Sequence, residues 1–228
     1  MRKFVLTMVA ALAMFFCNAQ KGYKIDGTVA GVPEGEAYFI LIEKGKADTL
    51  GRTEIKGGKF EFTGTVEEPT VYVVSVKGCP NGFRVFLENK VTTIMQIDVV
   101  QYNNTKIQGG EQQAILNKYQ ETIAPYTQKM MEISPRLMQS KNREELSKVQ
   151  AEMDEARKAE QEAMHKFIKE HGDSAAAAYI ATEGIGNYLQ SYVQKRYDLL
   201  SDKGKATKYG KLIAAELAKR AEKANNIK

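Results

Sequence analysis

The chain has 228 residues, of which 43% are hydrophobic and 27% charged, a composition ordinary for a soluble globular protein of one large or two small domains. Its formal net charge is +5, and it falls to +3 if Arg2 and Lys3 are removed with an export signal. This charge is too weak to indicate nucleic-acid binding, and the sequence has no basic patch with interleaved aromatic residues.

The N-terminus has the three parts of an export signal. Met1-Arg2-Lys3 is a short basic start, and Phe4–Phe16 is an uncharged, mostly apolar run of 13 residues. Small residues ending in Ala19 then offer a cleavage site. We therefore expect residues 1–19 to be a signal peptide cut after Ala19, and the mature protein to lie in the periplasm or cell envelope.

Two alternatives concern the same segment. An uncleaved membrane anchor is disfavoured because the apolar run is short for a bilayer span. Lipid attachment at Cys17 is disfavoured because the bulky Phe16 stands where a lipoprotein site has a small residue. Membrane association is expected only if Cys17 is lipidated. After cleavage Cys79 is the one remaining cysteine, so no internal disulfide can form and the fold depends on its packed core.

Residues 20–110 are predicted to form a β module. The clearest strand is 59–66, where Phe60, Phe62 and Val66 alternate with polar residues. The run 37–42 is apolar throughout, which predicts a central strand covered on both faces. Turn residues separate about eight such segments, a spacing typical of an antiparallel sandwich or barrel. The predicted strands are 23–29, 37–42, 48–55, 59–66, 71–76, 83–87, 91–97 and 105–108.

Residues 111–228 are predicted to be helical. A first helix covers 111–133, where Pro125 should kink or end it and Ser134-Pro135 should break it again. The strongest helix covers 142–170, and Asn142 fits its N-cap. Shorter helices are predicted at 175–181, 187–200 and 207–224. The fold class is therefore α+β: an antiparallel β-sandwich-like module followed by an all-helical segment.

Cys79 is a candidate redox or nucleophilic residue. A reactive thiol needs a base or a positive neighbour, and Lys77 and Arg84 are near it in sequence. His165 and His171 are far away in sequence, and no Cys-x-x-Cys exists to supply a resolving partner. We therefore interpret Cys79 as a loop residue beside a turn.

His165 and His171 are a candidate metal pair. Their spacing of six turns them about 240° apart on a helix, whereas zinc ligands usually stand three to five apart. We expect His165 at the edge of the apolar stripe and His171 as a cation at the C-terminus of the helix. No metal or other cofactor is predicted.

Three further groups of residues are candidate functional sites. The carboxylate pairs Glu67-Glu68, Glu144-Glu145 and Asp154-Glu155 are interpreted as surface charges. The strand aromatics could line a peptide groove, but core packing explains them with less effort; they are Tyr38, Phe39, Tyr72, Phe83 and Phe86. The apolar stripe from Leu146 to Phe167 could bind a partner helix, but we expect it to pack within its own chain. No catalytic, cofactor-binding or metal-binding residue is predicted.

Short motifs follow one another in a characteristic order along the mature chain. They occupy 23–29, 33–35, 48–49, 58–64, 67–69, 86–89 and 106–109. In this order they resemble the domain of unknown function 4369, the N-terminal module of exported bacterial thioredoxin-like proteins. The segments 170–174 and 199–201 resemble the region between that domain and the thioredoxin fold.

The resemblance implies a thioredoxin fold beyond this region, with a Cys-x-x-Cys active site. Here the sequence stops at Lys228, where that fold would begin, so no redox residue is carried over. We expect a non-catalytic binding or positioning module with an unknown protein or peptide partner, associated with thiol–disulfide chemistry. The alternatives are the front part of a thioredoxin-like oxidoreductase and a structural or chaperone-like helical clamp.

Overall fold

The computed structural model describes residues 21–43 and 45–225. The predicted signal peptide, with Cys17, lies outside these residues. Eight strands come first, and every predicted strand has a counterpart. They are β1 (Tyr23–Ala30), β2 (Glu34–Glu43), β3 (Lys46–Lys56), β4 (Lys59–Gly64), β5 (Thr70–Val76), β6 (Gly82–Leu87), β7 (Thr92–Asp98) and β8 (Lys106–Gln108).

The strands form one sheet in the order β6-β5-β2-β3-β4-β1-β7-β8. All neighbours pair antiparallel except β1 and β7, which pair parallel with Ile25 opposite Thr93 and Gly27 opposite Met95. The purely antiparallel arrangement that we predicted is therefore wrong at this position. Because five strands separate β1 from β7 in the chain, no hairpin turn fixes their relative direction.

The sheet core lies on the inner side of the curled sheet. As predicted, Phe60, Phe62 and Val66 are buried while Lys59 and Glu61 are exposed. The further buried members of this core are Tyr23, Ile25, Val29, Ala37, Phe39, Ile55, Val74, Val76, Phe83, Val85, Leu87, Met95 and Ile97.

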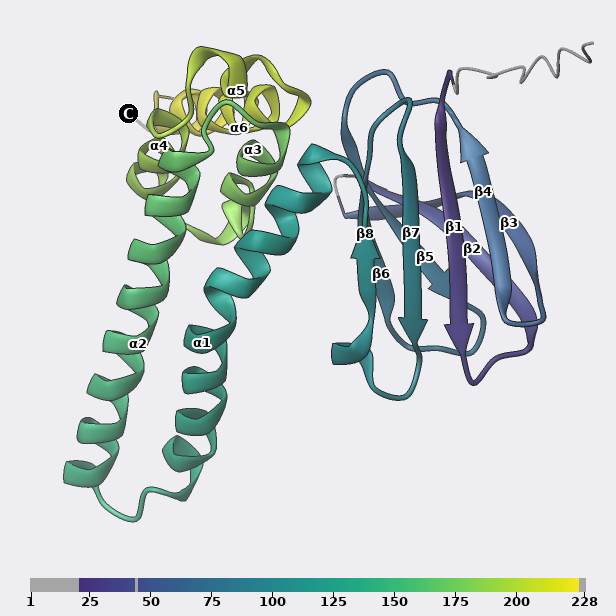
Figure 1. Ribbon diagram of the computed structural model, residues 1–228. Helices are drawn as coiled ribbons and strands as arrows, with labels where there is room; N and C mark the ends of the chain where they lie inside the picture. The colour runs from purple at the N-terminus through teal and green to yellow at the C-terminus, as the bar shows by residue number, and fades with distance from the viewer. Residues whose placement is uncertain (1–20, 44, 226–228) are drawn as a thin grey trace, which may run out of the picture.

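The prediction that β2 is covered on both faces is wrong. Phe39 is buried, but Tyr38 and Ile40 are only half-buried and Ile42 is exposed. Figure 1 shows the reason: the helices lie beside the β6 and β8 end of the sheet and leave the outer face of β2 partly open.

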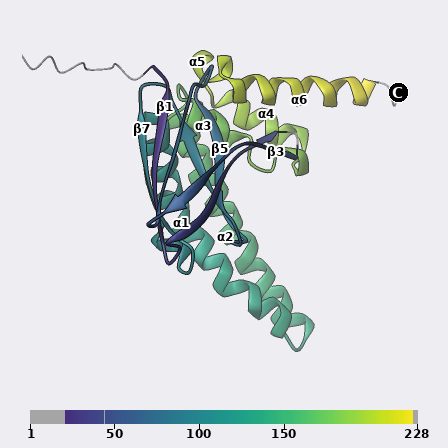
Figure 2. The ribbon, with the colours of Figure 1, turned by 90° about the vertical axis from the view of Figure 1, so that its right-hand side faces the viewer.

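Within the described residues, six α-helices follow the strands. They are α1 (Glu111–Gln139), α2 (Arg143–Glu170), α3 (Ala175–Ala181), α4 (Gln190–Asp198), α5 (Asp202–Ala206) and α6 (Lys208–Asn225). The sequence did not indicate α5 as a separate helix. Figures 1 and 2 show α1 and α2 as a long antiparallel hairpin, with the shorter helices gathered at its upper end. No helix within 21–43 or 45–225 is long and apolar enough to cross a membrane.

The helix α1 continues through both prolines, so the break predicted at Ser134-Pro135 is wrong and Pro125 does not end the helix. Pro125 and Pro135 lie on its exposed face, as do Glu121 and Met131 four residues before them. The carbonyls that lose a hydrogen bond to each proline can therefore be hydrated. The helix bends near its middle, where Pro125 stands, which agrees with the predicted kink (Figure 1).

The first turns of α1 join the two edge strands of the sheet. Gln113, which is buried, accepts a hydrogen bond from the backbone N–H of Phe86 in β6 at 2.7 Å. The same side chain donates to Asn117 at 2.7 Å, and Asn117 donates to the carbonyl of Ile107 in β8 at 2.7 Å. Two amide side chains thus satisfy main-chain groups on both edges.

The helical segment has its own core, and the sheet contributes to it. Val71 and Phe86 pack among the residues of α1, α2, α3 and α6. The hydroxyl of Tyr209 in α6 accepts a hydrogen bond from the Val71 backbone N–H at 2.7 Å. The backbone N–H of Lys208 donates to the Glu68 carboxylate at 2.9 Å. The sheet and the helices therefore share buried apolar and polar contacts.

Replacing Gln113 should test the importance of this edge closure. In Gln113→Ala the buried Phe86 N–H loses its acceptor, and we expect the free energy of unfolding to fall by about 1–3 kcal/mol. Gln150→Ala, at an exposed position of α2, is the control and should change it by less than about 0.5 kcal/mol. Urea unfolding followed by circular dichroism measures both. Equal stabilities of the two variants would show that the bridge contributes nothing.

Candidate functional site

A cavity of about 570 Å³ lies where the helices meet β6. We call it the Glu183 pocket and define it by its polar residues, each from a different element or loop, and by its apolar wall. The polar residues that define it are Arg84, Tyr119, Glu160, Tyr179, Glu183 and Arg196; the apolar wall includes Leu116, Ile123, Met131, Met164 and Tyr188. Four uncharged polar residues also line the pocket: Asn103, Gln120, Thr127 and Gln128. Convergence of polar groups on one partly apolar cavity is typical of ligand sites.

Glu183 is the central acid of this pocket. The Tyr119 hydroxyl donates to its carboxylate at 3.2 Å. Burial raises the pKa of Glu183 above its ordinary value, and the Tyr119 hydrogen bond and the charges of Arg84 and Arg196 offset this only in part. Burial likewise raises the pKa of Tyr119 and of Tyr179. Glu183 therefore holds its proton to a higher pH than an exposed glutamate does, and its protonated form can donate a hydrogen bond.

Arg196 in α4 is a buried cation with only 1% of its surface exposed. Its Nη1 donates to the carbonyls of Glu183 at 2.5 Å and of Ala181 at 3.5 Å. The guanidinium carbon lies 4.8 Å from the ring centroids of both Tyr188 and Tyr192. Within the part of the chain that the structure describes, Arg196 Nε has no partner.

The loop 182–189 forms one side of the pocket and is fixed by a second arginine. Arg220 in α6 donates to the carbonyls of Tyr188 at 2.6 Å and Ile185 at 2.5 Å. Gly184 has φ +66°, a conformation that favours glycine. Yet the end of this well-anchored loop is apolar and exposed, since Leu189 has 80% of its surface accessible. The two arginines together hold four carbonyls of residues 181–188.

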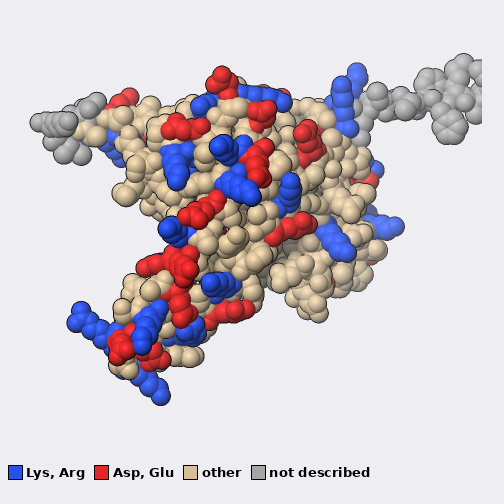
Figure 3. Space-filling model, turned by 60° about the vertical axis from the view of Figure 1, so that its left-hand side comes forward, with Lys and Arg blue, Asp and Glu red and all other residues tan. Residues whose placement is uncertain are grey.

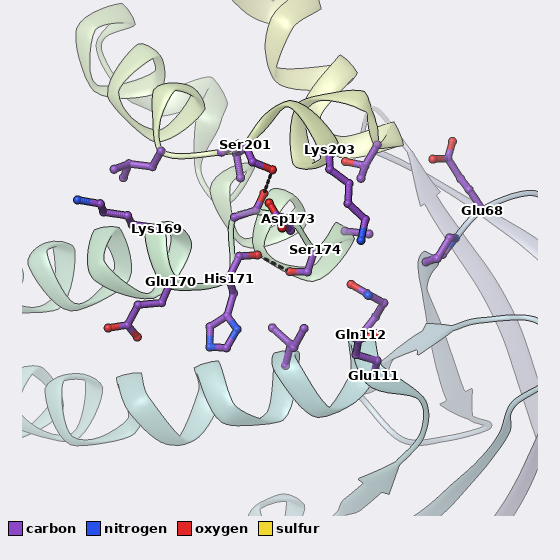
Figure 4. Close-up of a pocket in the computed structure, with 17 residues that line it drawn as sticks. Glu68, Glu111, Gln112, Lys169, Glu170, His171, Asp173, Ser174, Ser201 and Lys203 are labelled. Atoms are coloured by element: carbon purple, nitrogen blue, oxygen red, sulfur yellow. Dashed lines mark hydrogen bonds between the residues drawn. The ribbon is translucent and has the colours of Figure 1, made fainter.

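A second hollow, of about 700 Å³, lies between the end of α2, the start of α3, the start of α1, and α5 (Figure 4). In Figure 4 Lys203 points into it, whereas Lys169 and Glu170 point away. Its serines serve the backbone: Ser174 donates to the His171 carbonyl at 2.8 Å, and Ser201 to the Gly172 carbonyl at 3.3 Å. Because these groups already stabilise the helix ends, the Glu183 pocket is the better candidate site.

The structure places Cys79 after β5, half-buried against the sheet core. Its backbone N–H donates to the Val76 carbonyl at 3.0 Å, as in a turn. The Glu183 pocket does not include it. Its predicted lack of a catalytic role remains a prediction.

The two histidines lie in different surroundings. The ring of His165 packs on Tyr192 at 5.2 Å, and burial lowers its pKa. The ring of His171 packs on Phe167 at 4.5 Å, and its Nε2 lies 3.5 Å from Lys118 Nζ. Among residues 21–43 and 45–225, no group of His, Cys, Asp and Glu is arranged to hold a metal ion.

The acidic pairs have structural contacts rather than a common site. Glu68 accepts from the Lys208 backbone, as described above. Glu144 pairs with Lys148 at 2.7 Å, and Asp154 with Arg157 at 3.7 Å. None of the three pairs belongs to the Glu183 pocket.

Four of the five strand aromatics pack in the cores, as predicted. Phe39 and Phe83 are buried in the sheet core, and Tyr72 stacks on Phe39 with ring centroids 4.7 Å apart. Phe86 is buried in the helical core, edge-on to Tyr179. The fifth, Tyr38, belongs to neither core: it is half-buried, and its hydroxyl donates to the Glu36 carboxylate at 3.1 Å.

The apolar stripe of α2 packs within its own chain, as predicted. Val149, Met153 and Ala156 are buried with Ile133 of α1, and Phe167 is buried in the helical core. Only Leu146, at the start of the stripe, is exposed.

The Glu183 pocket was not predicted from the sequence. Its polar residues lie up to 112 positions apart, from Arg84 to Arg196, so no local motif joins them. One feature of the sequence could have indicated a buried acid here. Glu183 is a single acid two residues after the end of the buried helix α3, and it precedes Gly184 and Gly186. An acid in such a position is half-buried at the end of a core helix.

The fold defines an α+β protein in which a curled mixed sheet is joined to a helical segment. Residues 23–116 match the family described as Domain of unknown function (DUF4369), so the resemblance predicted for the N-terminal module is confirmed. The matched residues comprise the sheet and the first turns of α1, including Gln113. No significant match is found among curated proteins or solved structures.

The pKa of Glu183 predicts how stability depends on pH. Because folding raises this pKa above 4.5, the folded state holds the proton more tightly, and stability falls as pH rises from about 4.5 through the folded pKa. The fall is at most about 1.4 kcal/mol per pH unit. Burial also raises the pKa of Glu88, so the wild-type curve contains both contributions.

The variant Glu183→Gln removes the contribution of Glu183 to the pH dependence of stability, because an amide accepts the Tyr119 hydrogen bond without titrating. Urea unfolding at pH 5 and pH 8 should show a smaller loss of stability in the variant than in the wild type. Parallel pH dependence in the two proteins would contradict the assignment.

Proposed function

We propose that this protein is an exported, non-catalytic binding module and that the Glu183 pocket is its binding site. The observation that carries the proposal is the convergence of Arg84, Tyr119, Tyr179, Glu183 and Arg196 on one cavity with an apolar wall. These residues come from the sheet, three helices and the loop after α3. The site therefore exists only when the DUF4369 domain and the helical segment are packed together.

The anchored loop supports binding over a purely structural role. A fixed backbone reduces the entropy that a protein loses when a ligand orders it. Arg196 and Arg220 fix the carbonyls of 181–188, while Tyr188 and Leu189 remain exposed at the end of the loop. Exposed apolar side chains on a rigid surface are favourable contacts for a protein or peptide partner.

The compartment is proposed from the sequence of residues 1–19, and the association with thiol–disulfide chemistry from the resemblance alone. The proposed partner is a protein or peptide and not a nucleic acid. On the face seen in Figure 3, basic and acidic side chains are interspersed, which gives no extended positive surface for phosphates.

The helical clamp is the second candidate, and the α1–α2 hairpin favours it. The hairpin extends away from the sheet and ends in a small core of its own (Figures 1 and 2). Met138, near its end, has 91% of its surface exposed. A clamp would use this end of the hairpin, whereas the proposed pocket includes Met131 and Met164 further along α1 and α2.

Methionine methyl NMR separates the two candidates. In protein labelled with [methyl-¹³C]methionine, a library of short peptides should shift the methyl signals of Met131 and Met164 and leave Met138 unchanged. Arg220→Gln, which releases the loop, should weaken these shifts, and the exposed Arg157→Gln should not. Shifts confined to Met138 would favour the clamp, and no shifts at all would refute the proposed binding site.

An insulin-reduction assay tests the absence of redox catalysis. The purified protein should show no activity above that of the buffer with dithiothreitol, because Cys79 has no second cysteine among the described residues. Activity that disappears in Cys79→Ser would overturn the non-catalytic assignment.

A further inference from the structure

We propose that the Glu183 pocket binds the carboxylate of a ligand whose remaining part is apolar. The inference rests on the proposed function and names the ligand class of the same site. A free carboxylic acid and the C-terminus of a peptide share this chemistry.

The charges of the pocket favour an anion. Among the described residues, neither Arg84 nor Arg196 forms an ion pair, and Arg196 is bound only by carbonyls and aromatic rings. Arg196 is buried without an ion pair, and the Glu183 carboxyl group acts on it only through its charge, so a ligand anion bonded to Arg196 would offset part of the cost of burying the cation. Two arginines and two acids line the pocket, and burial raises the pKa of Glu183, which reduces the negative charge that offsets the arginines. The excess of positive charge is therefore small, and a single negative charge suits it better than the double charge of a phosphate.

The hydrogen-bonding groups of the pocket favour an acceptor. The Tyr179 hydroxyl has no hydrogen-bond partner in the described part of the chain and lines the cavity. Glu183 already accepts from Tyr119, and burial raises its pKa, so in its acid form it can donate to a ligand. Arg84 supplies further donors. A carboxylate has only acceptors and suits this set.

The apolar part of the wall favours an apolar group. Leu116, Ile123, Met131 and Met164 line the cavity beside the uncharged polar residues, and methionine adapts to differently shaped neighbours. A volume of about 570 Å³ is within the range of small-molecule sites. It can hold one or two apolar side chains next to a carboxylate.

Isothermal titration with matched acids and amides tests the proposal. The probes are 4-methylpentanoate against 4-methylpentanamide and acetyl-Leu-Leu against acetyl-Leu-Leu-amide. We expect each acid to bind at least about tenfold more tightly than its amide, since charge-assisted hydrogen bonds are about twice as strong as neutral ones. A preference for the small acid indicates a free carboxylic acid as the ligand, and a preference for the dipeptide indicates a peptide C-terminus.

Matched arginine variants locate the carboxylate. Arg84→Gln should reduce the affinity for the acid by about tenfold and leave that for the amide unchanged. Arg52→Gln removes an exposed arginine of β3 that does not line the pocket, and it should change neither. Equal losses in the two variants would indicate nonspecific charge attraction and overturn the proposal.

The pH dependence gives a second test. The charged and titratable side chains that line the pocket with Glu183 are Arg84 from β6, Tyr119 from α1, Glu160 from α2, Tyr179 from α3, Tyr188 from the loop 182–189 and Arg196 from α4. As pH rises through the raised pKa of Glu183, its negative charge appears and the affinity for the acid should fall. In Glu183→Gln this fall in affinity should be absent over the same pH range. The same fall in both proteins would contradict the role of Glu183.

The outcomes separate this inference from the proposed function. If acid and amide bind equally and shift the Met131 methyl signal, the carboxylate preference is wrong and the binding site stands. If neither binds, the carboxylate inference fails, and the peptide-library experiment alone decides whether the pocket is a binding site.

Discussion

The hydrogen bond from the Phe86 backbone to Gln113 is the constraint on which the rest of the structure depends. An eight-stranded sheet that curls without closing leaves main-chain groups on two edges, and buried unpaired groups are costly. Gln113 and Asn117 meet this requirement for β6 and β8 with one turn of α1. The helix that completes the sheet is also the first element of the helical segment, so the two parts are coupled.

The side chains of β6 alternate between the two faces of the sheet, and this alternation connects the sheet core with the pocket. Phe83, Val85 and Leu87 face the sheet core, whereas Phe86 packs in the helical core. Because side chains two apart on a strand share a face, Arg84 lies on the same side as Phe86 and reaches the helices. Gln112 adds a second connection, since it accepts a hydrogen bond from the Ala176 backbone at the start of α3. The closure of the sheet thus places Arg84 near Glu183, which lies two residues after the end of α3.

The sequence predicted the strands well because alternation records which side of each strand is buried, and it predicted the α2 stripe for the same reason. The predictions from the sequence were wrong where strand pairing or solvent exposure determines the structure. The direction of β7 against β1 depends on how the sheet curls, and the prolines of α1 are tolerated because their face is exposed. The pocket could not be predicted, since Arg84, Glu183 and Arg196 are ordinary residues locally and become a site only when distant elements pack.

The binding of Arg196 by carbonyls rather than by a carboxylate has a consequence for the pocket. A carboxylate bonded to the guanidinium within the chain would neutralise its charge. Carbonyls and tyrosine rings orient the cation and only partly stabilise it, so its positive potential extends into the cavity. The same contacts fix the loop 182–189, whose carbonyls are the acceptors. Arg196 therefore both fixes this side of the pocket and supplies positive electrostatic potential to it. A ligand anion that offsets the charge of Arg196 would also stabilise the loop.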